Sequence, residues 1–487
     1  MRTCTAVALL VVATASSCAA AETPSAPKGL LPASAASPPV AASPLVEPPP
    51  LTAIARPIPP PPPPQLDPDG NDDPEDPGTG TAPTAAHFER VGLPPLALER
   101  ICDLTPFDGS LYAAHANQPL GTDGATVTRY TPIAPDDTAH AKSSPFHVAY
   151  DWNRPGEPTG GGGAGQGFLR VHSIDGRLFV PDADPPYDGF GISEHGTEGY
   201  VFVSDRSGKF AKASGEHFHP PGVPSRDGGA GASVLPRAYH VLDVIKFRGR
   251  LYASTGAVPP RERAWRGPSP GALLVANESL SRFTYEVDYP FPWQNGVWRL
   301  GFMVRFKDRL FAGIQDYDGR EPNDYVVFSP DAASGRIDHA DVHPRRITAT
   351  GAAQTLRWYT DNGKLYWITL SRGSRHGDGA LRVSDDGDTW REIELPDDAG
   401  RPTDITRFRD ALVVMSERGL FKLAGDVPVR IATVTEKKTP FVLSDFFCSA
   451  PIAVFQNALY AGGQRNGALY RLVEDDAAST DGGAAPR

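Results

Sequence analysis

The fold is decided by one stretch, Phe247-Arg248-Gly249-Arg250-Leu251-Tyr252-Ala253, because variants of it recur along the chain. Each variant joins an apolar strand, a short polar or glycine turn and a Leu-aromatic strand, which predicts a β-hairpin. Repetition of one hairpin along a chain is typical of a propeller. The further copies occupy residues 107–113, 174–179, 306–312, 361–366, 408–413 and 455–461.

The spacing of the copies predicts an all-β fold, a seven-bladed β-propeller over residues 87–475. Leu365, Leu412 and Leu459 of the last three copies are evenly spaced, at an interval typical of a four-stranded blade, and insertions separate the earlier copies. The last copy lacks a fourth strand segment. We therefore expect residues 87–91 to supply that strand and to close the ring without an open edge.

Two cysteines, Cys102 and Cys448, stand on the expected innermost strands of the first and last blades. Ring closure makes these two blades neighbours. We therefore expect a disulfide between the two residues in an oxidising compartment. A pair of buried, unreactive thiols is the alternative.

The N-terminus has the pattern of an export signal, in which Arg2 precedes an apolar run at residues 6–13 that is too short to span a bilayer. Ala15-Ser16-Ser17-Cys18 resembles the lipobox of bacterial lipoproteins, which implies a signal peptide over residues 1–18 and acylation of Cys18. Cleavage near Ala19-Ala20-Ala21 by an ordinary signal peptidase is the alternative. Both interpretations predict an exported protein. The first adds attachment to a membrane of the cell envelope through a lipid anchor alone.

Residues 19–86 and 476–487 are expected to form a disordered linker and a disordered tail. The linker is rich in Ala, Pro, Ser and Thr, and it contains an unbroken proline run at residues 59–64 and an acidic block. Such a composition cannot bury enough apolar surface to fold. The formal net charge of −11 argues against a nucleic-acid partner, which requires a basic surface.

Ser384-Asp385-Asp386-Gly387-Asp388-Thr389-Trp390 resembles the Asp-box of sialidase-type (BNR-repeat) propellers. The resemblance implies a propeller fold over most of the chain. It does not imply an activity, because Asp-boxes are structural turns found in enzymes and binding proteins alike. A sialidase would also need an F-R-I-P-like motif, which is missing, and a Tyr–Glu pair. Tyr285 and Glu286 are adjacent in a strand and therefore point in opposite directions.

The long connections of the predicted propeller should all emerge on one face, because they join the second to the third strand of a blade or one blade to the next. Loops on a rigid scaffold commonly carry recognition or catalysis. Their aromatic and charged side chains suit a glycan or peptide groove, with solvated surface residues as the alternative. The candidates are Asp182, Asp184, Tyr187, Asp188, His195, Arg261, Trp265, Asp316, Tyr317 and Arg375.

A second set of candidates comes from counting back from each repeated leucine. Asp103, Arg170, Asp243 and Asp404 stand eight residues before it, and His240 and Arg299 stand eleven before it. These positions lie on the innermost strands and should line the central channel. The three aspartates could hold calcium, or they could lie in channel water or pair with Arg170.

These observations favour a monomeric protein that binds a glycan or protein ligand at the envelope surface through its looped face, without a cofactor other than a possible calcium ion. A glycoside hydrolase or lyase that uses the loop carboxylates is the first alternative, since two carboxylates at a suitable separation would suffice. An envelope scaffold protein is the second.

Overall fold

The structure is a computed structural model. It describes residues 76–117, 124–132, 144–152, 167–181, 200–216, 240–256, 268–280, 282–316, 319–330, 335–372, 378–434, 440–443 and 447–475. All of these residues belong to one compact unit, Pro62–Arg487. They contain β-strands and two short 3-10 helices, η1 (His339–Asp341) and η2 (Asp397–Ala399), but no α-helix. No helix in these ranges has the length and apolarity that a bilayer span requires.

Most strands pair antiparallel with their neighbours in groups of four, and further pairings link several of these groups into larger sheets. In chain order the groups are β2 (Arg100–Phe107), β3 (Ser110–Ala116), β4 (Thr126–Tyr130) and β5 (Phe146–Asp151); β6 (His172–Ile174), β7 (Arg177–Pro181), β8 (Tyr200–Ser204) and β9 (Phe210–Glu216); β10 (His240–Phe247), β11 (Arg250–Gly256), β13 (Gly271–Ala276) and β14 (Arg282–Tyr289); β15 (Gly296–Phe306), β16 (Arg309–Asp316), β17 (Tyr325–Phe328) and β18 (Val342–Arg345); β19 (Gln354–Asp361), β20 (Lys364–Leu370), β21 (Gly379–Ser384) and β22 (Arg391–Ile393); β23 (Pro402–Phe408), β24 (Ala411–Ser416), β25 (Gly419–Ala424) and β26 (Val427–Thr433); and β27 (Ile452–Phe455), β28 (Ala458–Gly462), β29 (Leu469–Glu474) and β1 (Ala86–Gly92).

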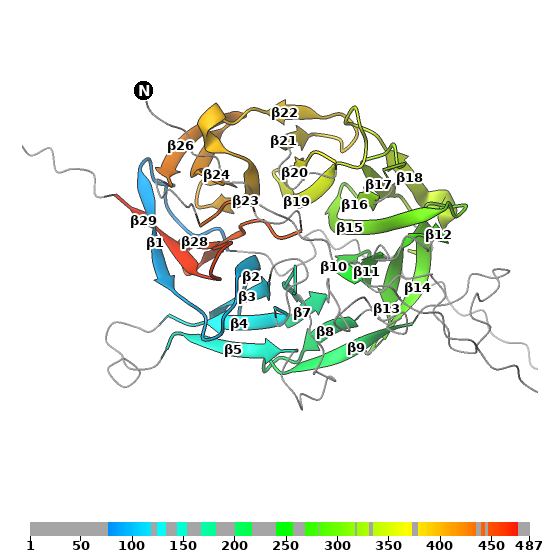
Figure 1. The fold of residues 1–487 in the computed structure, drawn as a ribbon, viewed down its shortest axis with the longest axis horizontal. Coiled ribbons are helices and arrows are strands. Elements are labelled where there is room, and N and C mark those ends of the chain that lie inside the picture. The colour runs from blue at the N-terminus through cyan, green and yellow to red at the C-terminus, as the bar shows by residue number, and fades with distance from the viewer. Residues whose placement is uncertain are drawn as a thin grey trace, which may run out of the picture. The chain divides into compact units, whose positions relative to one another are not determined.

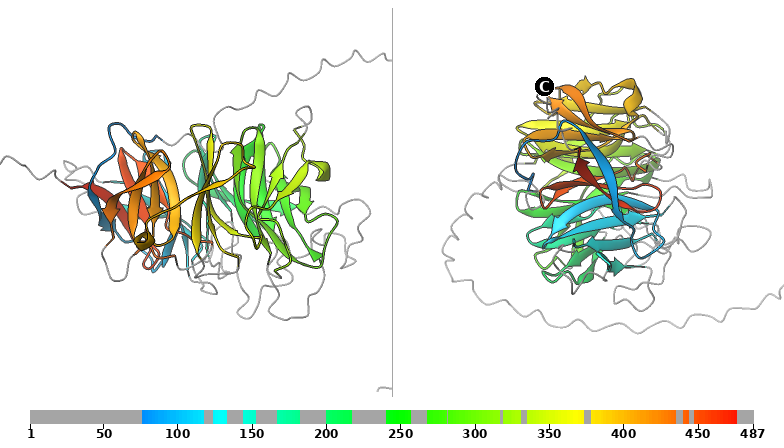
Figure 2. Two further views of the ribbon diagram at one scale, coloured as in Figure 1. Left: turned by 90° about the horizontal axis from the view of Figure 1, so that it is seen from above. Right: turned by 90° about the vertical axis from the view of Figure 1, so that its left-hand side faces the viewer.

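These groups are arranged around a common axis, as in a β-propeller (Figure 1). The colours follow the chain around the axis, and β2, β10, β15, β19 and β23 lie toward the centre. Figure 2 shows the same strands running across the thickness of the ring. These first strands therefore face the axis, as the repeated hairpin predicts.

The repeated phrase forms the turn between the first and second strands of its group. In the copy that joins β10 to β11, Arg248 has a φ of 50° and Gly249 a φ of 73°. Two consecutive residues with positive φ are characteristic of the type I′ turn, whose twist matches that of a hairpin. Glycine adopts this conformation without steric cost.

β1 pairs with β29, with His87 opposite Val473 and Phe88 opposite Leu472. This is the position at which the sequence places a fourth strand for the last group. The residues before β1 also pack on the ring, because the amide of Arg409 donates to the carbonyl of Pro77 at 2.6 Å and Ala82 is buried. The packed part of the chain therefore begins before residue 87.

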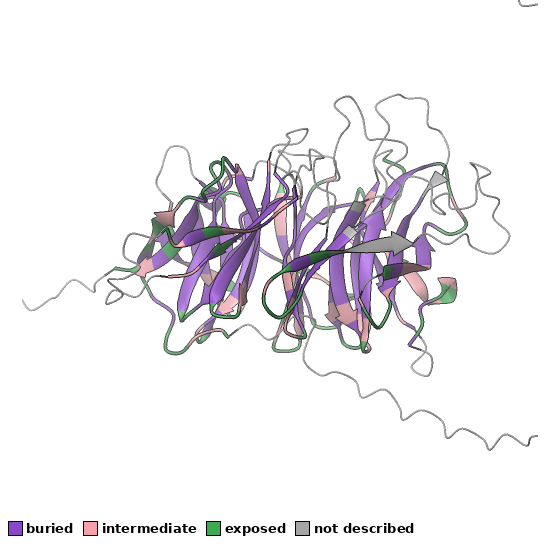
Figure 3. Ribbon diagram, turned by 90° about the horizontal axis from the view of Figure 1, so that it is seen from below, coloured by how far each residue is buried: buried purple, intermediate pink, exposed green. Residues whose placement is uncertain are grey.

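The core lies between adjacent groups (Figure 3, buried residues in purple). One cluster joins Ile368 and Val383 of β20 and β21 to Ile405 and Val414 of β23 and β24. Each sheet thus buries both faces against its neighbours, and burial of this kind is the main stabilising contribution to such a fold.

The expected disulfide is confirmed. Cys102 and Cys448 are bonded, with their Cα atoms 4.6 Å apart. The bridge links β2 to the segment that precedes β27 across a sequence separation of 346 residues. Oxidised cysteines are typical of exported proteins.

The turn after β21 contains the Asp-box-like residues. The Oδ1 atom of Asp386 accepts hydrogen bonds from the amides of Asp388 at 2.8 Å and Thr389 at 2.7 Å. These amides lower the pKa of Asp386. The indole of Trp390 donates to the Tyr325 hydroxyl at 2.9 Å, so the turn is fastened to the preceding sheet.

Candidate functional site

A repeated β-bulge places polar side chains on the propeller axis. The register between the first and second strands shifts before Asp103 in β2, Asp243 in β10, Arg357 in β19 and Asp404 in β23. A bulge re-aims the side chains next to it. As a result, the residue eight positions before the repeated leucine lines a central cavity.

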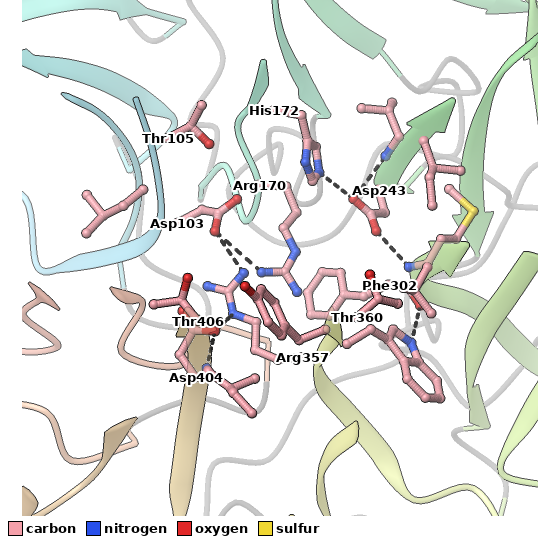
Figure 4. A pocket seen from close by; sticks show the side chains of 18 of the residues that line it. Asp103, Thr105, Arg170, His172, Asp243, Phe302, Arg357, Thr360, Asp404 and Thr406 are labelled. Carbon is pink, nitrogen blue, oxygen red and sulfur yellow. Dashed lines mark hydrogen bonds and ion pairs between the residues drawn. The ribbon is translucent and has the colours of Figure 1, made fainter. Parts of the chain in front are cut away.

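This axial cavity has a volume of about 320 Å³. The first strands of the groups form its wall, and Figure 4 shows the labelled side chains converging on it from several sheets. Its ionisable residues are Asp103, Arg170, His172, Asp243, Arg305, Arg357 and Asp404.

The three aspartates of the axial cavity connect neighbouring sheets. Asp103 accepts a hydrogen bond from the amide of Val171 at 3.0 Å, and Asp404 accepts one from the amide of Ile452 at 2.8 Å. Asp243 likewise accepts a hydrogen bond from the amide of Met303 at 2.7 Å. In each case the amide belongs to the inner segment of the next group, so these carboxylates brace the ring. Within the described ranges, no set of three or more His, Cys, Asp or Glu side chains is arranged to hold a metal ion, which leaves the calcium interpretation without support there.

Two arginines neutralise these carboxylates. The guanidinium of Arg357 donates to Asp103 at 2.8 Å and to the carbonyl of Cys102 at 2.7 Å, and its Nε lies 3.4 Å from Asp404. Arg170 lies 3.6 Å from Asp103 and stacks on the ring of Phe302, 3.7 Å from its centroid. The predicted pairing of the aspartates with Arg170 is thus present for Asp103, but Arg357 is the closer cation.

The sequence prediction missed Arg357 and Phe302, although the signal was available. Both residues stand eight positions before a repeated leucine, Leu365 and Leu310, in the same register as Asp103. Applying the count to every copy, instead of selecting the acidic ones, would have found both side chains.

Burial sets the electrostatics of the cavity. Asp404 is almost completely buried, and this burial raises its pKa to about 6, although Arg357 and the amides of Ile452 and Ile405 act in the opposite direction. Asp243 is also buried, and His172 lies 2.7 Å from it. Such partnered carboxylates are typical of a preformed, rigid cavity.

An apolar cluster, which we call the plug, includes Cys102, Leu169, Leu242, Phe302 and Cys448 and shares Phe302 with the cavity lining. Cys102, Leu169 and Leu242 each directly precede a cavity residue in the chain, so the plug lies toward the side at which the long connections arrive. At the other end, the lining reaches Arg305, which is half-buried, and Thr360, which is exposed, beside the short hairpin turns. The cavity therefore faces the short turns.

Most loop candidates lie outside the described residues, namely Asp182, Asp184, Tyr187, Asp188, His195, Arg261, Trp265, Tyr317 and Arg375. Asp316 ends β16 with a fully buried side chain, which accepts from the amide of Glu321 at 2.7 Å and lies 3.3 Å from Arg372. Its carboxylate thus holds a turn. Of the residues eleven before the leucine, His240 begins β10, and its side chain is outside the description. Arg299 is buried and lies over the ring of Phe447, apart from the described cavity lining.

A second site, which we call the aromatic corner, comprises Tyr285, Phe291, Trp293 and His339 around Asp288. Asp288 is fully buried and accepts from the Trp293 indole at 2.8 Å and the Tyr285 hydroxyl at 3.1 Å. His339 Nε2 lies 2.8 Å from its other oxygen. The ring of Phe291 stacks on His339 at 3.7 Å, and Phe291 is 58% exposed. A buried carboxylate thus orients aromatic rings at the surface.

The aromatic corner lies where the ends of two candidate loops converge. β12 (Pro268–Ser269), which follows the segment of Arg261 and Trp265, pairs with Gly296 and Val297 at the start of β15. Arg320, which follows Tyr317, donates to the carbonyl of Asn295 at 3.1 Å. Both contacts involve residues 295–297, which closely follow Phe291 and Trp293 in the chain.

No family model and no curated protein matches the chain. Among solved structures, it is similar to a catalytically inactive virginiamycin B lyase from Staphylococcus aureus with quinupristin, at 8% identity and a TM-score of 0.46 over 80% of this chain and 100% of that one. It is also similar to the extracellular domain of BT4673 from B. thetaiotaomicron, at 9% identity and a TM-score of 0.46 over 81% of this chain and 42% of that one. A third likeness, to an alpha-L-arabinanase of Penicillium chrysogenum complexed with arabinobiose, has 11% identity and a TM-score of 0.34 over 61% of this chain and 90% of that one. At these scores the likenesses carry no functional argument.

Proposed function

We propose that this chain is an exported, seven-bladed β-propeller that binds a glycan or protein ligand through the face of its long connections. The pairing of β1 with β29 supports a closed ring, and the Asp386 turn supports a relation to Asp-box propellers. The disulfide and the apolar run after Arg2 support export, with Cys18 as the lipid-bearing residue.

The observation that carries the binding function is the aromatic corner. Aromatic side chains are common among the few residues that supply most of the binding energy at interfaces. Here Phe291 is exposed while Asp288 fixes the neighbouring rings. Orientation before binding reduces the entropy lost when a ligand docks. Flat rings beside polar loops suit a sugar face or an aromatic-rich peptide.

The experiment is an array of glycans and candidate envelope proteins probed with the full exported chain and with Phe291→Ala. We expect the affinity of the variant for the ligand to fall by roughly tenfold or more, as for an interface hot spot. Val427→Ala is the matched control, because Val427 is 64% exposed on the distant strand β26. Equal binding by the wild type and Phe291→Ala would refute the role of the corner.

A glycosidase or lyase is the second candidate, through Asp182, Asp184 and Asp188 of the looped face. Two carboxylates about 5–9 Å apart would be required. The same array distinguishes the functions, since release of sugar from a bound glycan, and its loss in Asp182→Ala or Asp184→Ala, would replace binding by hydrolysis as the conclusion. An envelope scaffold would bind protein partners and no glycan.

A further inference from the structure

The axial cavity has the properties of a ligand site that is separate from the looped face. Its volume of about 320 Å³ is at the lower end of the range of small-molecule sites, roughly 300–1,000 Å³. We propose that it binds a small hydroxylated monocarboxylic acid, which enters from the side of the short hairpin turns. This inference does not depend on the function proposed for the looped face.

The route of entry follows from the plug. Cys102 and Cys448 are bonded within it, and Leu169 and Leu242 complete its apolar wall. A polar ligand crossing this layer would have to be desolvated in an apolar environment, which is unfavourable. The opposite end has the exposed residue Thr360 and is therefore the accessible one.

The charged groups deep in the cavity are already engaged by the protein. Asp103, Asp243 and Asp404 hold backbone amides, and Arg357 donates to Asp103. Arg170 donates to the carbonyl of Leu356 at 3.0 Å and also lies over Phe302. These groups form the walls. Exchanging their present contacts for contacts with a ligand would add little to the free energy of binding.

Arg305 differs from the other cations of the cavity. It is half-buried at the mouth, and it has no hydrogen-bond, ion-pair or ring partner among the residues that the structure describes. A guanidinium binds a carboxylate through two parallel hydrogen bonds, and partial burial strengthens this pairing. The cavity thus offers one unpaired positive charge at its entrance.

The rest of the lining determines the ligand class. The hydroxyl of Thr360 lines the exposed mouth and can exchange hydrogen bonds with hydroxyls of a ligand, and the Thr105 hydroxyl, which donates to the carbonyl of Val171 at 2.5 Å, can still accept one. Within the described lining, Arg170 and Arg357 are already paired with Asp103, so a phosphate dianion would find a single further positive charge at Arg305, which disfavours it. A single carboxylate with several hydroxyls meets both conditions.

The test uses the full exported chain with D-gluconate as the probe and sorbitol and inorganic phosphate as comparisons. Sorbitol has the same six-carbon skeleton but carries a CH2OH group in place of the carboxylate. We expect gluconate to bind in calorimetry and to raise the melting temperature, with the rise growing roughly as the logarithm of the gluconate concentration above the Kd. We expect sorbitol and phosphate to bind more weakly by roughly tenfold or more, because one lacks the charge and the other carries too much.

Substitutions then locate the site. Arg305→Gln should weaken gluconate binding by roughly tenfold or more, and Arg305→Lys should be intermediate because it keeps the charge without the bidentate geometry. Arg465→Gln, which removes an exposed arginine elsewhere, is the matched control and should bind like the wild type. If Arg305→Gln fails to fold, Thr360→Val at the mouth should still reduce affinity for gluconate.

Three results would overturn the proposal. The first is that gluconate does not bind. The second is that gluconate binds equally well to the wild type and to Arg305→Gln, which would place the gluconate site elsewhere. The third is that phosphate binds more tightly than gluconate, which would replace carboxylates by phosphates as the ligand class.

Discussion

The axial cavity and the aromatic corner use the same residue type in opposite ways. In the cavity, buried aspartates such as Asp103 and Asp404 accept bonds from backbone amides of the next sheet. At the corner, buried Asp288 receives side-chain donors, the indole of Trp293 and the hydroxyl of Tyr285. The first use joins sheets, and the second orients rings toward solvent. Changes to the buried aspartates of the cavity should therefore cost mainly stability, and changes at the corner mainly binding.

The largest effect is expected for Arg357→Met. The substitution removes the cation that contacts both Asp103 and Asp404 and leaves two buried carboxylates poorly compensated. We expect the free energy of unfolding to fall by about 3–5 kcal/mol. Urea denaturation measures the loss, and Arg391→Met, which breaks an exposed pair with Asp426, should change it by less than about 1 kcal/mol. Similar losses of stability in the two variants would contradict a structural role for the ion pairs of Arg357 with Asp103 and Asp404.

The pH dependence of stability should report on Asp404. Its pKa is raised from 3.8 to about 6 in the folded protein, so the folded state binds more protons than the unfolded state between these values. The stabilising contribution is complete below pH 3.8 and is lost as pH rises through about 6. Over that window the wild type should lose about 3 kcal/mol relative to Asp404→Asn.

Unfolding of both proteins across this window gives the measurement. Exposed Asp378 is the control position, where substitution by Asn should leave the slope unchanged. A constant difference between wild type and Asp404→Asn would show that the carboxyl does not titrate there.

A smaller loss is expected for Asp288→Ala at the corner. The donors from Trp293, Tyr285 and His339 would lose their common acceptor, which costs about 1–3 kcal/mol of unfolding free energy. Ligand binding should fall further than stability, because the rings lose their orientation. Chemical denaturation and the ligand array measure the two effects. An intact ligand response in a destabilised Asp288→Ala protein would separate the corner from binding.

The sequence predicted the features that depend on the repeated hairpin and on the pairing between the two ends of the folded chain. The hairpin phrase indicated the first two strands of each group, and the end of the chain indicated where Cys102 and Cys448 would meet. The leucine count brought Asp103 and Asp404 to one cavity, but the bulges that aim them, and the end at which the cavity opens, have no signature in single residues.

The aromatic corner could not be predicted at all. Asp288 and His339 are 51 residues apart and belong to different groups, and neither stands in the repeated register. Their contact depends on how the connection after β17 crosses to β14, which only packing determines.

The smallest effect on stability is expected for Phe291→Ala, and it sharpens the comparison most. Phe291 is 58% exposed, so its removal forfeits mainly the stacking on His339, about 0.5–1 kcal/mol. Phe302→Ala is the matched control, because the same side chain is 3% exposed beside the axial cavity and should cost several times more. Thermal unfolding of the two variants gives the ratio. Comparable losses would mean that the corner is part of the folded core, and the binding defect of Phe291→Ala would then have to be attributed to unfolding.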